Sequence, residues 1–152
     1  MPYVLTVDQR ASRRTPDRVA DVLRDLNATV PAVLGFERTA GDEFQGVLAG
    51  PAEVVDVVLR LVRVGGWSIG VGAGPVQTPL PASTRAGAGP AFLSARRAVD
   101  AAKQRPTRLA VRGAVPAEAG DAQAVLSALA VVVERRSEQA WEAIALVDAG
   151  RT

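Results

Sequence analysis

Apolar residues along the first 112 positions follow two patterns, short continuous runs and longer stretches of helical periodicity. The short runs are rich in β-branched residues and predict strands at 3–7, 33–40, 43–49, 67–73 and 107–112. Apolar residues that recur every three or four positions predict helices at 15–30, 51–64 and 91–104. The predicted order of elements is therefore β-α-β-β-α-β-α-β.

This order predicts an α+β domain with a ferredoxin-like βαββαβ core, followed by an extra helix and strand. In such a core the sheet is antiparallel, the helices lie on one face, and the first and third strands are neighbours. The end of the first strand then lies beside the start of the third. The pattern therefore predicts that Asp8 lies close to Asp42 and Glu43.

The rest of the chain has less regular patterns. From about Ala119 the pattern changes to helices, expected at 122–136 and 137–148, so we divide the chain into an α+β domain (1–113) and a helical extension (114–152). Residues 74–90 are rich in Gly, Pro, Ser and Ala and predict a long mobile loop rather than a phosphate cradle. The glycines of the fourth strand predict close approach by a neighbouring backbone.

Composition narrows the chemistry that the chain can perform. It has no cysteine and no histidine, which excludes disulfides, thiolate chemistry and histidine acid–base catalysis, and no zinc or haem site is expected. A bound metal would need oxygen ligands, which favours Mg²⁺ or Mn²⁺. The net charge of +2 is too small to indicate a nucleic-acid partner. With no signal-peptide pattern and apolar runs broken short of a membrane span, we expect a cytoplasmic protein without membrane contact.

The stretch TAGDEFQG, residues 39–46, places two acids after a glycine. Gly41-Asp42 is a tight-turn signal between two strands, so this stretch predicts a β-hairpin. The converging acids Asp8, Asp42 and Glu43 need a counter-charge, which a metal ion would supply. Arginine is the other source, and the candidates cluster at Arg10, Arg13 and Arg14. That cluster is itself either a solvated face or a phosphate site.

Several motifs together resemble the SatD family, whose fold is similar to that of class III nucleotide cyclases and diguanylate cyclases. The motifs occur in order within residues 3–112: a strand ending in Asp, an arginine-rich helix entry, TAGDEFQG, GWSIGVGAG and AGPAFLSARRAVDAAK. The resemblance implies metal ligands at Asp8, Asp42 and Glu43, and nucleotide or phosphate ligands at Arg96, Arg13 and Arg14. It also implies a homodimer, because class III cyclases place their sites at dimer interfaces.

The chain departs from the cyclase pattern at two positions. Phe92 stands where the cyclases have the asparagine of an Asn-x-x-x-Arg pattern, and Ala40 precedes Gly41 where diguanylate cyclases have a second glycine. Phenylalanine donates no hydrogen bond to a ribose or phosphate. We therefore expect a regulatory domain that binds a nucleotide or Mg-phosphate ligand without efficient turnover. A nucleotidyl cyclase that uses two metals is the enzymatic alternative.

A third alternative is a non-catalytic dimerisation module of a helix-turn-helix regulator. Residues 135–150, RRSEQAWEAIALVDAG, resemble the opening helix of such a module, as commonly found in the family. No recognition helix follows in the sequence, so this chain alone is expected not to read a DNA sequence.

Overall fold

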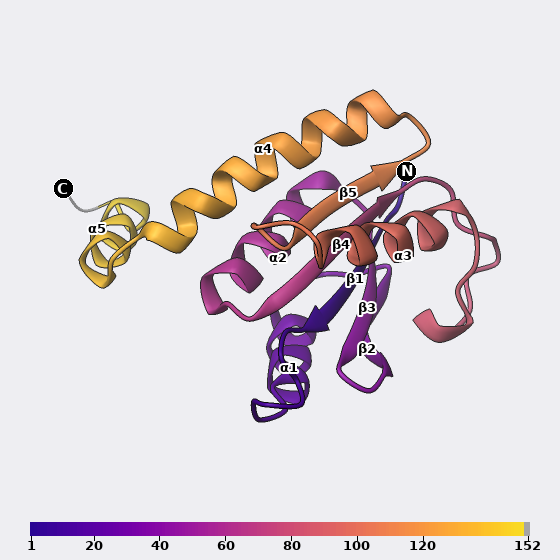
Figure 1. Cartoon of the computed structure of the whole chain (residues 1–152), viewed down its shortest axis with the longest axis horizontal. Helices are drawn as coiled ribbons and strands as arrows, with labels where there is room; N and C mark the ends of the chain where they lie inside the picture. The colour runs from indigo at the N-terminus through magenta and orange to yellow at the C-terminus, as the bar shows by residue number, and fades with distance from the viewer. Residues whose placement is uncertain (151–152) are drawn as a thin grey trace.

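The computed structural model describes residues 1–150 and has a five-stranded mixed β-sheet covered by helices (Figure 1). The α+β class is therefore confirmed. The strands are β1 (Tyr3–Gln9), β2 (Leu34–Ala40), β3 (Glu43–Leu48), β4 (Trp67–Ala73) and β5 (Leu109–Gly113). The helices are α1 (Val19–Thr29), α2 (Pro51–Val64), α3 (Pro90–Ala102), α4 (Pro116–Arg135) and α5 (Glu138–Asp148), with a short 3₁₀ turn, η1 (Thr84–Ala86).

The strands lie in the order β2-β3-β1-β4-β5. Strand β1 is antiparallel to both β3 and β4, whereas β5 runs parallel to β4. The pairing of β1 with β3 sets Asp8 opposite Glu43. The predicted neighbourhood of the first and third strands is therefore confirmed.

The two faces of the sheet carry different helices. Leu5 and Val7 of β1 belong to the large apolar core that also holds buried residues of α1, α2 and α4. Val4, on the opposite face, packs with α3 in a separate cluster. The two helices of the expected core, α1 and α2, therefore share one face, as predicted. Helix α3, which belongs to the extra helix and strand, lies on the other face.

The position of α3 also gives the fold two crossovers of opposite hand. Helices α2 and α3 each connect parallel strands and step in the same direction along the sheet, β3 to β4 and β4 to β5. They lie on opposite faces, so one of the two crossovers is left-handed, which is rare. The long connection between β4 and α3 allows the chain to pass to the second face.

Glycines in β4 let α3 lie directly on the sheet. A Cβ added to Gly70 would meet the backbone of Val99 at 2.2 Å, and one added to Gly72 would meet the carbonyl oxygen of Ala91 at 2.2 Å. The facing side of α3 carries small residues, including Ala91 and Ala95, which are fully buried. The predicted close approach of a neighbouring backbone to β4 is confirmed.

Helix α1 begins later than the sequence predicts, at Val19 rather than near Thr15. The buried amide of Gln9 holds the preceding residues in a loop: its nitrogen donates to Thr15 Oγ1 (3.0 Å) and to the carbonyl oxygen of Pro16 (2.7 Å). Its oxygen accepts from the backbone N–H of Arg18 at 2.9 Å. These bonds satisfy backbone groups that a longer helix would otherwise use.

Helix α4 begins six residues earlier than predicted, with Pro116 at its first turn and Glu118 beside its positive end. Among the described residues 1–150 it is the one helix long and apolar enough to cross a membrane by length and composition alone. Charged residues are expected to break the apolar runs short of a membrane span, but in α4 the two acids Glu118 and Asp121 both lie near its start. Its buried side belongs to the domain core: Ala119, Leu126, Ala130 and Val133.

We predict that Gly72→Ala lowers the free energy of unfolding by about 1 to 3 kcal/mol, because the new methyl group forces α3 away from β4. Urea unfolding of purified protein measures the change. Gly120→Ala is the matched control, since a Cβ at Gly120 in α4 meets nothing within 4 Å. It should raise stability by up to about 1 kcal/mol. Equal losses in both variants would contradict the close-packing argument.

Candidate functional site

Three carboxylates converge where β1 ends and β3 begins. Asp8 is the penultimate residue of β1, Asp42 lies in the hairpin turn and Glu43 begins β3. The backbone N–H of Gln9 donates to the carbonyl oxygen of Asp42 at 3.0 Å, which fixes the hairpin turn against β1. Gly41 has a φ of +50°, a conformation that glycine adopts at little cost. The predicted convergence of the acids is confirmed by this register.

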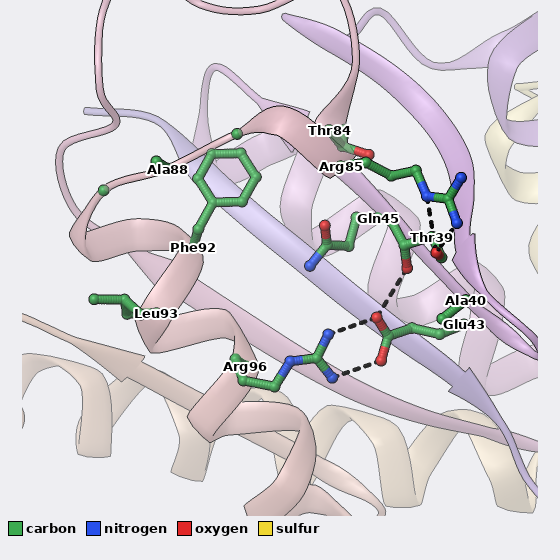
Figure 2. A pocket seen from close by; sticks show the side chains of 12 residues that line it. Thr39, Ala40, Glu43, Gln45, Thr84, Arg85, Ala88, Phe92, Leu93 and Arg96 are labelled. Carbon is green, nitrogen blue, oxygen red and sulfur yellow. Dashed lines mark hydrogen bonds and ion pairs between the residues drawn. The ribbon is translucent and has the colours of Figure 1, made fainter.

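Glu43 forms a two-pronged ion pair with Arg96 of α3 (Figure 2). Each of the two nitrogen–oxygen distances is 2.6 Å, and Thr39 Oγ1 also donates to Glu43 at 2.8 Å. Burial alone would raise the pKa of Glu43, but the hydrogen bonds and charge of Arg96 outweigh it and hold that pKa below its usual range. Glu43 is therefore ionised near neutral pH.

Asp8 is paired with Lys103, just past the end of α3. Asp8 Oδ2 lies 2.8 Å from Lys103 Nζ, while Asp8 Oδ1 is buried and has no hydrogen-bond partner within residues 1–150. Burial raises the pKa of Asp8, and the neighbouring Asp42 adds to that effect against the opposing influence of Lys103.

The pKa of Asp42 shifts in the opposite direction to that of Asp8. Burial alone would raise the pKa of Asp42, but hydrogen bonding from Ser12 and its proximity to Asp8 leave it lowered. Of the two neighbouring carboxyls, Asp8 therefore takes up a proton first as the pH falls.

A cleft of about 600 Å³ lies above Glu43 and Arg96. Its walls are the β2–β3 hairpin, the first turns of α3 with Phe92 and Leu93, and the segment around η1 (Figure 2). Glu37 of β2 fixes that segment by accepting hydrogen bonds from the hydroxyl and the backbone N–H of Thr84. These bonds also hold the pKa of Glu37 below its usual range.

Arg85 also lines this cleft, on the side formed by the segment around η1. Its guanidinium donates twice to the carbonyl oxygen of Thr39, at 2.9 and 2.6 Å. The segment predicted as a mobile loop thus forms, at its η1 end, one side of the cleft. The side chain of Arg96 remains 46% exposed, so its guanidinium can still meet a ligand.

A second cleft, of about 410 Å³, lies on the other side of the hairpin turn. Asp42 and Arg13 both line it, together with Arg38, whose guanidinium contacts Asp17 at 2.8 Å. Arg14 is exposed and lines neither cleft. Of the predicted phosphate ligands, the structure brings Arg96 and Arg13 next to the acids, in separate clefts.

The counter-charges come from α3 rather than from the arginine cluster. Within residues 1–150, no ion pair joins Arg10, Arg13 or Arg14 to Asp8 or Asp42. Sequence reasoning missed Lys103. It follows Arg96 by two helical turns, and that spacing is the signal that would have placed both cations over the same strands.

The carboxylate oxygens of Asp8, Asp42 and Glu43 supply only some of the ligands that a divalent metal ion needs. Asp8 Oδ1 has no partner and lies beside Asp42, and carboxylate oxygens are the ligands that Mg²⁺ prefers. Both oxygens of Glu43 are already bonded to Arg96. Among residues 1–150 no cluster of three acidic, histidine or cysteine side chains is arranged to hold a metal. Two carboxylates would hold Mg²⁺ only with further oxygens from water or a phosphate.

No protein-family model, curated protein or solved structure matches the chain. The resemblance to the SatD family therefore stays a prediction. Function has to be inferred from the side chains of the site rather than from the fold.

We predict that Lys103→Met destabilises the protein by about 1 to 2 kcal/mol at pH 7, because it leaves the partly buried Asp8 carboxylate without its cation. The value is below that of a fully buried pair since Lys103 is 37% exposed. The pKa of Asp8 is already raised, and loss of Lys103 raises it further. The native variant then binds a proton more readily than the unfolded chain, so the loss should shrink as the pH falls through that pKa.

Urea unfolding of wild type and variant at pH 7 and at a pH near 4.5 measures both effects. Asp8→Asn is the matched background: in that background Lys103→Met should cost much less, which a double-mutant cycle quantifies. A loss that is equal at both pH values, or unchanged in the Asp8→Asn background, would contradict an electrostatic origin.

Proposed function

We propose that the chain is a SatD-type, cyclase-like regulatory domain that binds a nucleotide or related phosphate ligand with Mg²⁺ and does not turn it over efficiently. The observation that carries the proposal is the unpartnered, buried oxygen of Asp8 beside Asp42, next to a cleft that holds the exposed edge of Arg96. Mg²⁺ commonly binds through one or two carboxylates plus phosphate oxygens, which is what this pair of acids offers.

The cleft itself supports a phosphate ligand. It contains two arginines, Arg85 and Arg96, and the N-terminal end of α3, where the helix dipole favours negative charge. Arg96 is balanced by Glu43, so an incoming phosphate would share the guanidinium with that carboxylate. The strand order β2-β3-β1-β4 supports a ferredoxin-like core beneath this site.

Absence of efficient turnover is supported by Phe92. Its side chain is 8% exposed, packs in the apolar cluster with Val4 and Val47, and lines the cleft one helical turn before Arg96. An apolar ring at this position offers no hydrogen bond to a ribose or a transferring phosphoryl group. A regulatory role in the cytoplasm, with the bound ligand as the signal, is the function that these features favour.

We predict that Mg²⁺ with ATP or GTP raises the melting temperature. A ligand at about 100 times its dissociation constant adds about 2.7 kcal/mol, or about 5 to 10 °C for a chain of this size. Differential scanning fluorimetry at millimolar nucleotide, with and without Mg²⁺ or Mn²⁺, measures the shift. Asp42→Asn should remove the metal-dependent part, and Asp25→Asn, an exposed acid on α1, should leave the shift intact.

The same samples test turnover and specificity. With Mn²⁺ present, we expect neither triphosphate to be converted to a cyclic product, as followed by chromatography over several hours. No thermal shift with either nucleotide at millimolar concentration would refute the proposal. Steady product formation would instead favour the two-metal cyclase alternative.

A non-catalytic dimerisation module is the second candidate function. One observation favours it: α4 exposes several large apolar side chains beside its buried stripe, namely Val125, Leu129 and Val132. Contiguous apolar surface of this kind is typical of an interaction site.

A further inference from the structure

Helix α4 carries two apolar stripes. The inner stripe is the buried set that packs on α2 and β5, described above. The outer stripe consists of Ala122, Val125, Leu129 and Val132, which alternate at three- and four-residue spacing. Its three larger members are 61%, 39% and 51% exposed. This spacing is that of the a and d positions of a coiled coil, in which one helix packs against another.

The helix runs along the outside of the domain, and its far end projects toward α5 (Figure 1). Beside the outer stripe lies a groove of about 390 Å³ between α2 and α4. Val54 and Val55 of α2 and Leu126 of α4 are among the residues that line it, and nearly all of its surface is apolar. The outer stripe and the groove form one continuous apolar surface because Val125 and Leu129 belong to both.

The outer stripe is symmetric about Ser127. Val125 and Leu129 lie two positions before and after it, and Ala122 and Val132 lie five positions before and after it. Two copies of α4 packed antiparallel about Ser127 would therefore match Val125 with Leu129 of the other copy, and Ala122 with Val132. An isologous dimer requires a self-complementary surface of this kind.

The charges at the two ends of α4 match the same arrangement. Glu118 and Asp121 lie near the start of the helix, and Arg135 and Arg136 at its end. Glu118 and Arg136 are each nine positions from Ser127, so an antiparallel partner brings them together. Parallel packing would instead set acid beside acid and arginine beside arginine. The antiparallel orientation also opposes the two helix dipoles favourably.

We propose that the chain forms a homodimer in which the outer stripes of two α4 helices pack antiparallel about Ser127. The partner is a second copy of this chain, because its stripe supplies both the apolar pattern and the charge order that this surface requires. Each protomer keeps its own cleft above Glu43 and Arg96, because that cleft is built from α3 and the β2–β3 hairpin, whereas α4 covers the opposite face of the sheet. Dimer formation is therefore independent of ligand binding in the cleft.

Sedimentation velocity of the full chain from about 1 to about 500 µM tests the interface. Wild type should show a concentration-dependent dimer. Val125→Glu should raise the dimer dissociation constant at least about 100-fold, since each dimer would bury two unpaired charges. Ala124→Glu adds the same charge one position earlier, on an exposed part of α4 outside the stripe, and should leave the constant within about threefold.

Orientation can be tested with single cysteines, because the chain has none of its own. Val125→Cys and Leu129→Cys proteins are mixed, oxidised with diamide and analysed by mass. The proteins are mixed in equal amounts, for which random pairing gives about twice as much mixed disulfide as either symmetric one. Antiparallel packing predicts a mixed fraction well above this random value, because only the mixed pair has its Cβ atoms within disulfide reach. Excess symmetric disulfides would show parallel packing and overturn the arrangement.

Three further results would overturn the proposal. The first is a wild type that stays monomeric throughout the range. The second is equal weakening of the dimer by the two glutamate variants. The third is a monomer that pellets with vesicles of phosphatidylcholine and phosphatidylglycerol in an α4-dependent way, which would assign the stripe to a lipid surface instead. Circular dichroism of each variant confirms that the fold is retained.

Discussion

The close contact between α3 and β4 is the constraint on which the site depends. Gly70 and Gly72 leave no side chain between the helix and the strand, so the helix axis lies nearer the sheet than larger residues would allow. At that depth Arg96 and Lys103 reach Glu43 and Asp8, which project from the same face of the sheet. The charge balance of the cluster is thus set by backbone packing several residues away. The position of α3 and the ionisation of the acids are consequently coupled.

That coupling explains why the site resembles a ligand site and also a closed ion-pair network. The charges of the three acids are largely balanced by those of Arg96 and Lys103. Both carboxylate oxygens of Glu43 already accept hydrogen bonds. Among residues 1–150, Asp8 Oδ1 has no hydrogen-bond partner, and the carboxyl group of Asp42 lies next to it. A buried acceptor without a partner costs free energy. A cation or a proton at that oxygen would reduce the cost.

The sequence was sufficient for the element order and for the meeting of Asp8 with Glu43, because strand periodicity and a glycine turn are local signals. It was insufficient where distant side chains decide the outcome. The late start of α1 depends on hydrogen bonds of the Gln9 side-chain amide. In the sequence, Gln9 cannot be told apart from any other residue at the end of a strand. The periodicity of α3 also does not specify which face of the sheet it covers; in the structure it lies on the face where Gly70 and Gly72 leave room for its backbone. Lys103 was overlooked because its partner is 95 residues earlier in the chain.

The order in which the charges enter the chain has a consequence for synthesis on the ribosome. All three acids lie within the first 43 residues, whereas Arg96 and Lys103 are added more than 50 residues later. N-terminal segments emerge first and begin to fold before the rest is made. Pairing of β1 with β3 would then bring carboxylates together while their cations are still inside the ribosome. The nascent sheet is therefore expected to stay open until α3 has emerged, which makes docking of that helix a late and decisive step of folding.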